Sequence, residues 1–105
     1  MRAMKTARRL VQGRLRADKV DAYVRYHQAV WPELLEAYRQ AGITRISCFL
    51  HGVDLFVYSE FEVETYEREK EALRRHPVEV RWQALMATLR DPDFAPVEYT
   101  EVFHM

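Results

Sequence analysis

The sequence predicts an α+β fold, in which one antiparallel sheet carries helices on a single face. The chain has 105 residues, which is enough for one packed core and too few for two, so residues 1–105 are expected to form a single domain. β-Branched and aromatic runs at 43–50 and 54–62 flank His51-Gly52, which is the pattern of a hairpin. Apolar residues at helical spacing both precede and follow this hairpin.

The first strand is predicted at residues 10–16, because apolar positions alternate there with polar ones, as in a strand with one buried face. Residues 1–9 contain several basic side chains and no acidic one, and they are expected to form a flexible terminus. Asp18 is the expected N-cap of the helix that follows.

A helical segment is predicted from Val20 to Gly42, with an interruption at Trp31-Pro32. Apolar residues follow helical spacing along this segment, and Gly42 is a typical C-terminal stop. Pro32 cannot donate the backbone hydrogen bond that a continuous helix requires, and it disfavours helical geometry at Trp31. Two helical pieces are therefore expected, the second with Pro32 at its first position.

The rest of the chain predicts two helices and a strand. Residues 63–76 are heavily charged and form a solvated helix, residues 78–89 form a helix with one apolar face, and residues 97–103 form the last strand. The order of strands and helices is that of ferredoxin-like (βαββαβ) folds. Because helices cover only one face of such a sheet, the other face is expected to meet a second copy of the chain, giving a homodimeric α+β barrel.

Composition excludes several classes of partner. Sixteen basic residues balance sixteen acidic ones, so neither nucleic acid nor a membrane surface is expected as a partner. Cys48 is the only cysteine, which rules out a disulfide framework or a thiolate metal cluster and favours a reducing, cytoplasmic location. It is predicted to be a buried small hydrophobic residue.

The residues best suited to chemistry lie on the first helix. Tyr23 and His27 are four residues apart and so share one face, where a phenol and an imidazole can converge on a ligand. Histidine titrates close to physiological pH and can donate a proton, although a core histidine bonded to a backbone carbonyl is the alternative interpretation. Trp31 and Trp82 could form apolar walls for a ring-shaped ligand or could simply pack in the core.

Other polar residues give weaker signals. His51, His76 and His104 have no metal-ligand spacing, so they are interpreted as surface residues and no metal is expected. Glu60 and Glu101 on predicted strands could line a cleft or point outward. The chain contains no glycine-rich phosphate loop, which argues against a nucleotide cofactor.

Two stretches, RYHQAVWPE (25–33) and HPVEVRWQALM (76–86), together with Tyr23 and the terminal EVF, resemble the L-rhamnose mutarotase family from about Leu10 to Phe103. The resemblance implies a ferredoxin-like homodimer, an isomerase that interconverts the α and β anomers of 6-deoxy-L-sugars without a cofactor. It implies that His27 is the general acid and that Tyr23 and Trp82 contact the sugar.

Two positions depart from the rhamnose-type pattern. Ile46 stands where those members have a sugar-contacting tyrosine, and Gln83 stands where they have a second tryptophan. The two stretches are equally similar to the L-fucose mutarotase branch of the family, and a polar Gln83 could distinguish the hydroxyl orientations of the two sugars by hydrogen bonding.

The general base stays open at this point, with Tyr23, a strand carboxylate such as Glu60, or a bound water as candidates. Two other classes of protein share the predicted fold. One is a small ferredoxin-like monooxygenase or haem-binding dimer with His27 as an iron ligand. The other is a non-enzymatic ligand-binding domain.

Overall fold

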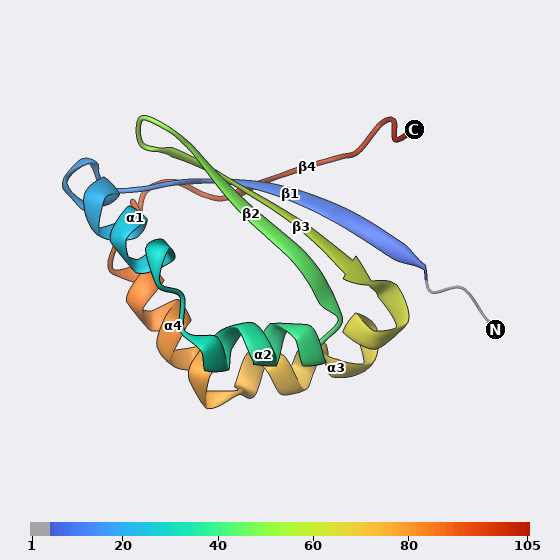
Figure 1. Cartoon of the computed structure of the whole chain (residues 1–105). Coiled ribbons are helices and arrows are strands. Elements are labelled where there is room, and N and C mark those ends of the chain that lie inside the picture. Colours follow the sequence, from blue (N-terminus) through green and yellow to red (C-terminus); the bar gives the residue numbers. More distant parts are fainter. Residues whose placement is uncertain (1–4) are drawn as a thin grey trace.

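The computed structural model describes residues 5–105 and arranges them as a sheet with helices beneath it (Figure 1). In chain order the elements are β1 (Thr6–Arg14), the 3₁₀ helix η1 (Ala17–Lys19), α1 (Val20–Gln28), α2 (Pro32–Gln40), β2 (Ile43–His51), β3 (Asp54–Glu62), α3 (Val63–Arg75), α4 (Pro77–Ala87) and β4 (Val97–Tyr99). Within residues 5–105 the strands form a four-stranded antiparallel sheet in the order β2-β3-β1-β4. This order and the helix placement confirm the predicted ferredoxin-like α+β fold.

The hairpin at the centre of the sequence forms as predicted. β2 pairs with β3 so that His51 faces Asp54, and Gly52 lies between them in the turn with a φ of 62°. Only glycine adopts this left-handed backbone conformation without steric cost, so the turn that aligns the two strands depends on it. β3 also pairs with β1 along its full length, so β3 and β1 are the two inner strands of the sheet.

The proline residues end helices where the sequence predicts. Trp31 has φ −58° and ψ 124°, outside the helical region, and α2 begins at Pro32. The same arrangement recurs at His76-Pro77, where the His76 ring also accepts a hydrogen bond from the backbone N–H of Val78 at 3.2 Å. Each break redirects the chain, so that four short helices fit beneath one sheet.

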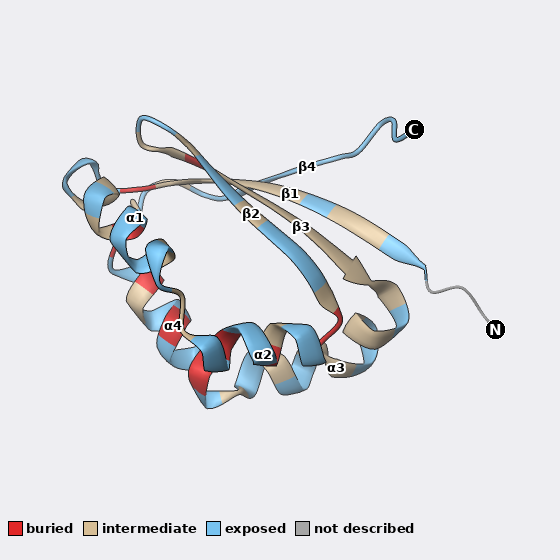
Figure 2. Cartoon of the chain, in the orientation of Figure 1, coloured by how far each residue is buried: buried red, intermediate tan, exposed pale blue. Residues whose placement is uncertain are grey.

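The core lies between the sheet and the helices (Figure 2). Its most completely buried large side chains are Leu15, Leu34 and Val78, from the end of β1, from α2 and from α4. Strand alternation sends Leu55 into this core, while Phe56, next along β3, points to the opposite face. On that opposite face Phe49 is 59% exposed and Tyr99 is 45% exposed.

Three local predictions are wrong. β1 begins at Thr6, so residues 6–9, predicted to be flexible, belong to a strand; Met1 to Met4 lie outside the described residues. β4 ends at Tyr99, four residues before the predicted end. Asp18 lies inside η1, and α1 has no side-chain cap.

Cys48 is also not the buried hydrophobic residue that was predicted, because its side chain is exposed. It lies on β2, which is an edge strand of the sheet, and it faces the helices. In the part of the chain that the structure describes, no helix is both long enough and apolar enough to span a membrane.

Candidate active site

A cavity of about 410 Å³ opens between the sheet and the helices. Its lining comes from α1, α2, α4 and the two hairpin strands, together with Arg90 just after α4. Five residues predicted to form the site line it: Tyr23, His27, Ile46, Trp82 and Gln83. The fold therefore brings together side chains that are distant in the sequence.

His27 is held by its own helix. Its Nδ1 lies 2.8 Å from the carbonyl oxygen of Tyr23, and because a carbonyl oxygen can only accept, Nδ1 carries the hydrogen. The imidazole stacks on the Tyr23 ring at a centroid distance of 4.0 Å and meets the Trp82 ring edge-on at 5.2 Å. The hydrogen bond to a backbone carbonyl, which is expected of a core histidine, is thus present. Nε2 nevertheless remains available to a ligand in the cavity.

Tyr23 contributes a neutral hydroxyl. Its side chain is buried, and burial is the main cause that raises the pKa of the Tyr23 hydroxyl; the adjacent Cys48 thiol raises it further. A phenol with a raised pKa keeps its proton at neutral pH. The protonated Tyr23 hydroxyl can therefore donate a hydrogen bond, and it is a poor general base.

The two tryptophans occupy different positions. Trp82 is buried in α4 and also lines the cavity. Trp31, predicted to contact the sugar, is not among the lining residues; its ring packs edge-on against Trp82 at a centroid distance of 5.1 Å. Trp31 therefore packs behind the indole that lines the cavity, and it does so from the N-cap position of α2.

The two carboxylates predicted to be on strands lie away from the cavity: Glu60 is on β3, whereas Glu101 lies beyond the end of β4. Glu60 accepts a hydrogen bond from the Tyr58 hydroxyl at 2.9 Å, and Glu101 forms an ion pair with Arg8 at 2.7 Å. Tyr58 and Glu60 are two residues apart on β3 and share the face turned away from the helices. Glu60 consequently cannot act as the base in the cavity.

The predicted surface histidines lie away from the cavity. His51 is in the hairpin, His76 caps α4, and His104 lies beyond β4. Among residues 5–105 no cluster of three histidine, cysteine, aspartate or glutamate side chains has metal-site geometry.

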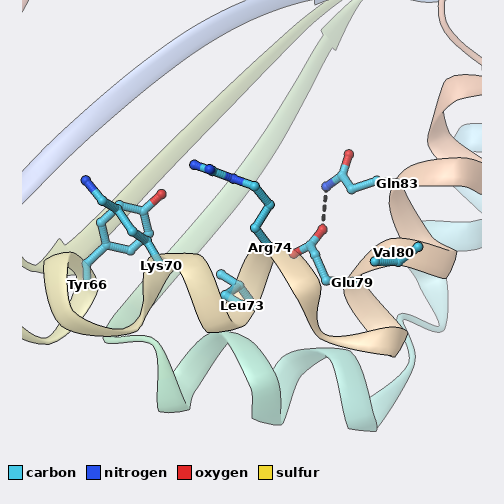
Figure 3. Close-up of a pocket in the computed structure, with 7 residues that line it drawn as sticks. All are labelled: Tyr66, Lys70, Leu73, Arg74, Glu79, Val80 and Gln83. Atoms are coloured by element: carbon cyan, nitrogen blue, oxygen red, sulfur yellow. Dashed lines mark hydrogen bonds between the residues drawn. The ribbon is translucent and has the colours of Figure 1, made fainter.

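Sequence reasoning missed Glu79. Its carboxylate accepts a hydrogen bond from Gln83 at 2.6 Å (Figure 3). It accepts a second hydrogen bond from the Tyr38 hydroxyl at 3.2 Å. The pKa of the Tyr38 hydroxyl is raised, mainly because the side chain is buried. The negative charge of Glu79 and the hydrogen bond to Glu79 raise it further. The only sequence signal was the i, i+4 spacing of Glu79 and Gln83 in a helix, which does not reveal that the tertiary packing buries the carboxylate.

The ferredoxin-like domain thus places a histidine, a tyrosine and a tryptophan around an open cavity, which is the arrangement of a small-molecule site. Residues 8–105 match the family described as L-rhamnose mutarotase. The chain belongs to the L-rhamnose mutarotase family. A relative with that name from Jannaschia sp. strain CCS1 is 36% identical over 87 residues, which cover 79% of this chain and 83% of the relative.

Solved structures agree with the fold. The crystal structure of an L-rhamnose mutarotase from Formosa agariphila superposes with a TM-score of 0.73 at 25% identity, covering 94% of this chain and 98% of that one. A crystal structure of an antibiotic biosynthesis monooxygenase gives a TM-score of 0.61 at 14% identity, covering 93% and 99%. The second likeness concerns the fold alone.

Proposed function

We propose that this protein is a mutarotase that interconverts the α and β anomers of a 6-deoxy-L-sugar, L-rhamnose or L-fucose, by general acid–base catalysis without a cofactor. The observation that carries the proposal is the His27 imidazole, whose Nδ1 is bonded to the chain while Nε2 stays free beside Trp82 in the cavity. Membership of the L-rhamnose mutarotase family supports the sugar class.

The reaction requires two proton transfers at one end of the sugar. A donor protonates the ring oxygen while an acceptor removes the proton of the anomeric hydroxyl, and the bond between C1 and the ring oxygen breaks to give the open-chain aldehyde. Rotation about the C1–C2 bond exposes the other face of the aldehyde, and the reverse transfers close the ring as the other anomer. In this scheme protonated His27 donates from Nε2 to the ring oxygen, and the Nδ1 bond to the Tyr23 carbonyl fixes the orientation of the ring.

The cavity suits a monosaccharide. Its volume of about 410 Å³ is within the range of about 300–1,000 Å³ that is usual for small-molecule sites. The Trp82 indole offers an apolar surface to the C–H face of the sugar, and the Tyr23 hydroxyl offers a hydrogen-bond donor. Ile46 provides an apolar surface for the C6 methyl group that distinguishes 6-deoxy sugars from ordinary hexoses.

The catalytic demand is modest. Anomers already interconvert in water, and a positioned acid and base typically accelerate a reaction by about 10² to 10⁴-fold. Holding the sugar in one orientation adds to this rate. One oriented imidazole as the acid, with a bound water as the base that takes the proton of the anomeric hydroxyl, is therefore sufficient for the chemistry in a domain of 105 residues.

The protein acts as a homodimer in this proposal. Its interface is the sheet face that carries Phe49, Phe56 and Tyr99, where the Phe56 and Tyr99 rings lie 6.5 Å apart. An exposed apolar face of this kind is typical of a protein–protein interface. The cavity lies on the opposite, helix-covered face, so dimer formation leaves it open to the sugar.

The test is saturation-transfer NMR of anomer exchange, with L-rhamnose, L-fucose and a hexose that bears a C6 hydroxyl. Wild-type protein should speed the exchange of at least one 6-deoxy sugar, and His27→Ala should lose about 10² to 10⁴-fold in rate while its melting temperature stays near that of wild type. Exposed His51→Ala is the matched control and should keep full activity.

Absence of enhanced exchange with every sugar would contradict the proposal. A ligand-binding domain without activity would bind sugar equally well with and without His27. A haem-binding dimer would show a Soret band once haem is added, and that band would be lost in His27→Ala.

A further inference from the structure

Glu79 is a buried carboxylate that forms no ion pair with another residue in the range 5–105. It is 7% exposed, and it is the buried charged residue among residues 5–105. None of the ion pairs formed by the described residues includes it. Burying a carboxylate without a counter-charge is costly, so a carboxylate retained at such a position calls for a reason beyond packing.

Two donors converge on one oxygen of Glu79. Oε1 accepts from Gln83 Nε2 at 2.6 Å and from Tyr38 Oη at 3.2 Å. The Gln83 bond fixes which end of its amide faces Glu79, and the Gln83 carbonyl oxygen accepts from Arg90 at 3.5 Å. Gln83 is therefore held at both ends of its amide group, in the wall of the cavity.

The second oxygen of Glu79 is open. No hydrogen bond to Oε2 is observed, and among the described residues no fully buried side-chain nitrogen or oxygen lacks a partner. Oε2 is therefore accessible to solvent, and Glu79 lies in the wall of an open groove that Lys70 and Arg74 also line (Figure 3). Glu79 lines a recess of about 220 Å³ together with Tyr38, Ile46 and Val57, three residues that also line the candidate active site.

We propose that Glu79 is a specificity-determining residue, whose Oε2 accepts a hydrogen bond from a ring hydroxyl of the bound sugar while its Oε1 orients Gln83 toward the same ligand. The inference rests on the proposed mutarotase function. It assigns the specificity for one sugar over the other to Glu79 and Gln83. L-Rhamnose and L-fucose differ in the orientation of the hydroxyls at C2 and C4. A charged acceptor at a fixed position favours one orientation and leaves the other unpaired.

This role differs from that of His27. The sugar hydroxyl that meets Glu79 is not a reacting group, so the bond forms in the ground state and persists in the transition state. Its loss should raise KM and leave kcat nearly unchanged. Removal of His27, in contrast, should lower kcat.

The experiment measures kcat and KM for anomer exchange with L-rhamnose and L-fucose in wild type, Glu79→Gln and Glu79→Leu. Glu79→Gln keeps the shape and the Oε1 acceptor, so it tests the charge in a folded protein, and its melting temperature is recorded alongside. Exposed Glu36→Gln on α2 is the matched control for the same chemical change away from the cavity.

We expect Glu79→Gln to raise KM for the preferred sugar about 10-fold and Glu79→Leu about 100-fold, the range for a lost hydrogen bond to a charged group. The preference of wild type for one sugar should shrink in both variants, while Glu36→Gln keeps it. If wild type is active and Glu79→Gln has the same KM and the same sugar preference as wild type, this inference is overturned while the proposed function stands. No activity in wild type would overturn the proposed function and this inference together.

Discussion

Gly42 connects α2 to β2 at a point where no side chain fits. Its φ of 84° lies in the left-handed region, and a Cβ atom added there would lie 2.8 Å from Thr65 Cβ and 3.3 Å from the backbone oxygen of Glu62. Thr65 is in the first turn of α3, and the Gly42 carbonyl accepts a hydrogen bond from the Glu62 N–H at 2.8 Å. The backbone of β2, which carries Ile46 and Cys48 into the cavity, is thus fixed by a contact that requires glycine.

Gly42→Ala should therefore lose stability for two reasons. The left-handed conformation costs a residue with a Cβ about 1–2 kcal/mol, and forcing a methyl group against Thr65 costs about 1–3 kcal/mol more. Gly52→Ala is the matched control, because its φ of 62° is also positive but nothing lies within 4 Å of the added Cβ. Only the first cost of about 1–2 kcal/mol applies to it.

The assay is urea and thermal denaturation followed by circular dichroism. For a domain of about this size, 1 kcal/mol corresponds to a shift of about 4–8 °C in Tm. Gly42→Ala should melt below Gly52→Ala by about 4–24 °C, with an unchanged m-value. Equal losses in the two variants would refute the reasoning, since they would show that the contact with Thr65 carries no energy.

Three further predictions concern the core, the buried phenols and the open sheet face. Leu34→Ala should cost about 2–5 kcal/mol in a denaturation experiment, because Leu34 is almost fully buried. Burial raises the pKa of Tyr38, so the folded protein retains a proton that the unfolded chain loses near pH 10; stability should fall as pH rises above about 10, and less steeply in Tyr38→Phe. Phe49→Asp should shift the protein from dimer to monomer in analytical ultracentrifugation and leave the fold intact, whereas an unaltered dimer would exclude the open face as interface.

Local signals account for the elements that could be predicted. The proline at position 32, the turn at His51-Gly52 and the i, i+4 spacing of Tyr23 and His27 all act within a few residues, and each is present in the structure. Strand alternation and helix order then sufficed for the fold, because few arrangements of these elements bury their apolar faces.

The missed features depend on partners distant in the sequence. The basic start of β1 is a strand because it pairs with β3 and because Arg9 meets Glu98 at 2.8 Å, a contact 89 residues away. Cys48 is exposed because β2 lies at the edge of the sheet. Glu79, buried at the start of α4, bonds to Tyr38 on α2, 41 residues away. No local sequence pattern reveals these long-range contacts.

The break at Trp31-Pro32 has a consequence for motion. It leaves His27 in the last turn of α1, a helix of nine residues, and isolated helices shorter than about 12 residues are marginal in water. α1 therefore owes its persistence to its docking through Tyr23 and Trp82, and its end should fray more readily than the strands. The proposed acid thus lies in the last turn of a short helix, so a sugar that fills the cavity should hold that turn in place and slow the hydrogen exchange of the α1 amides.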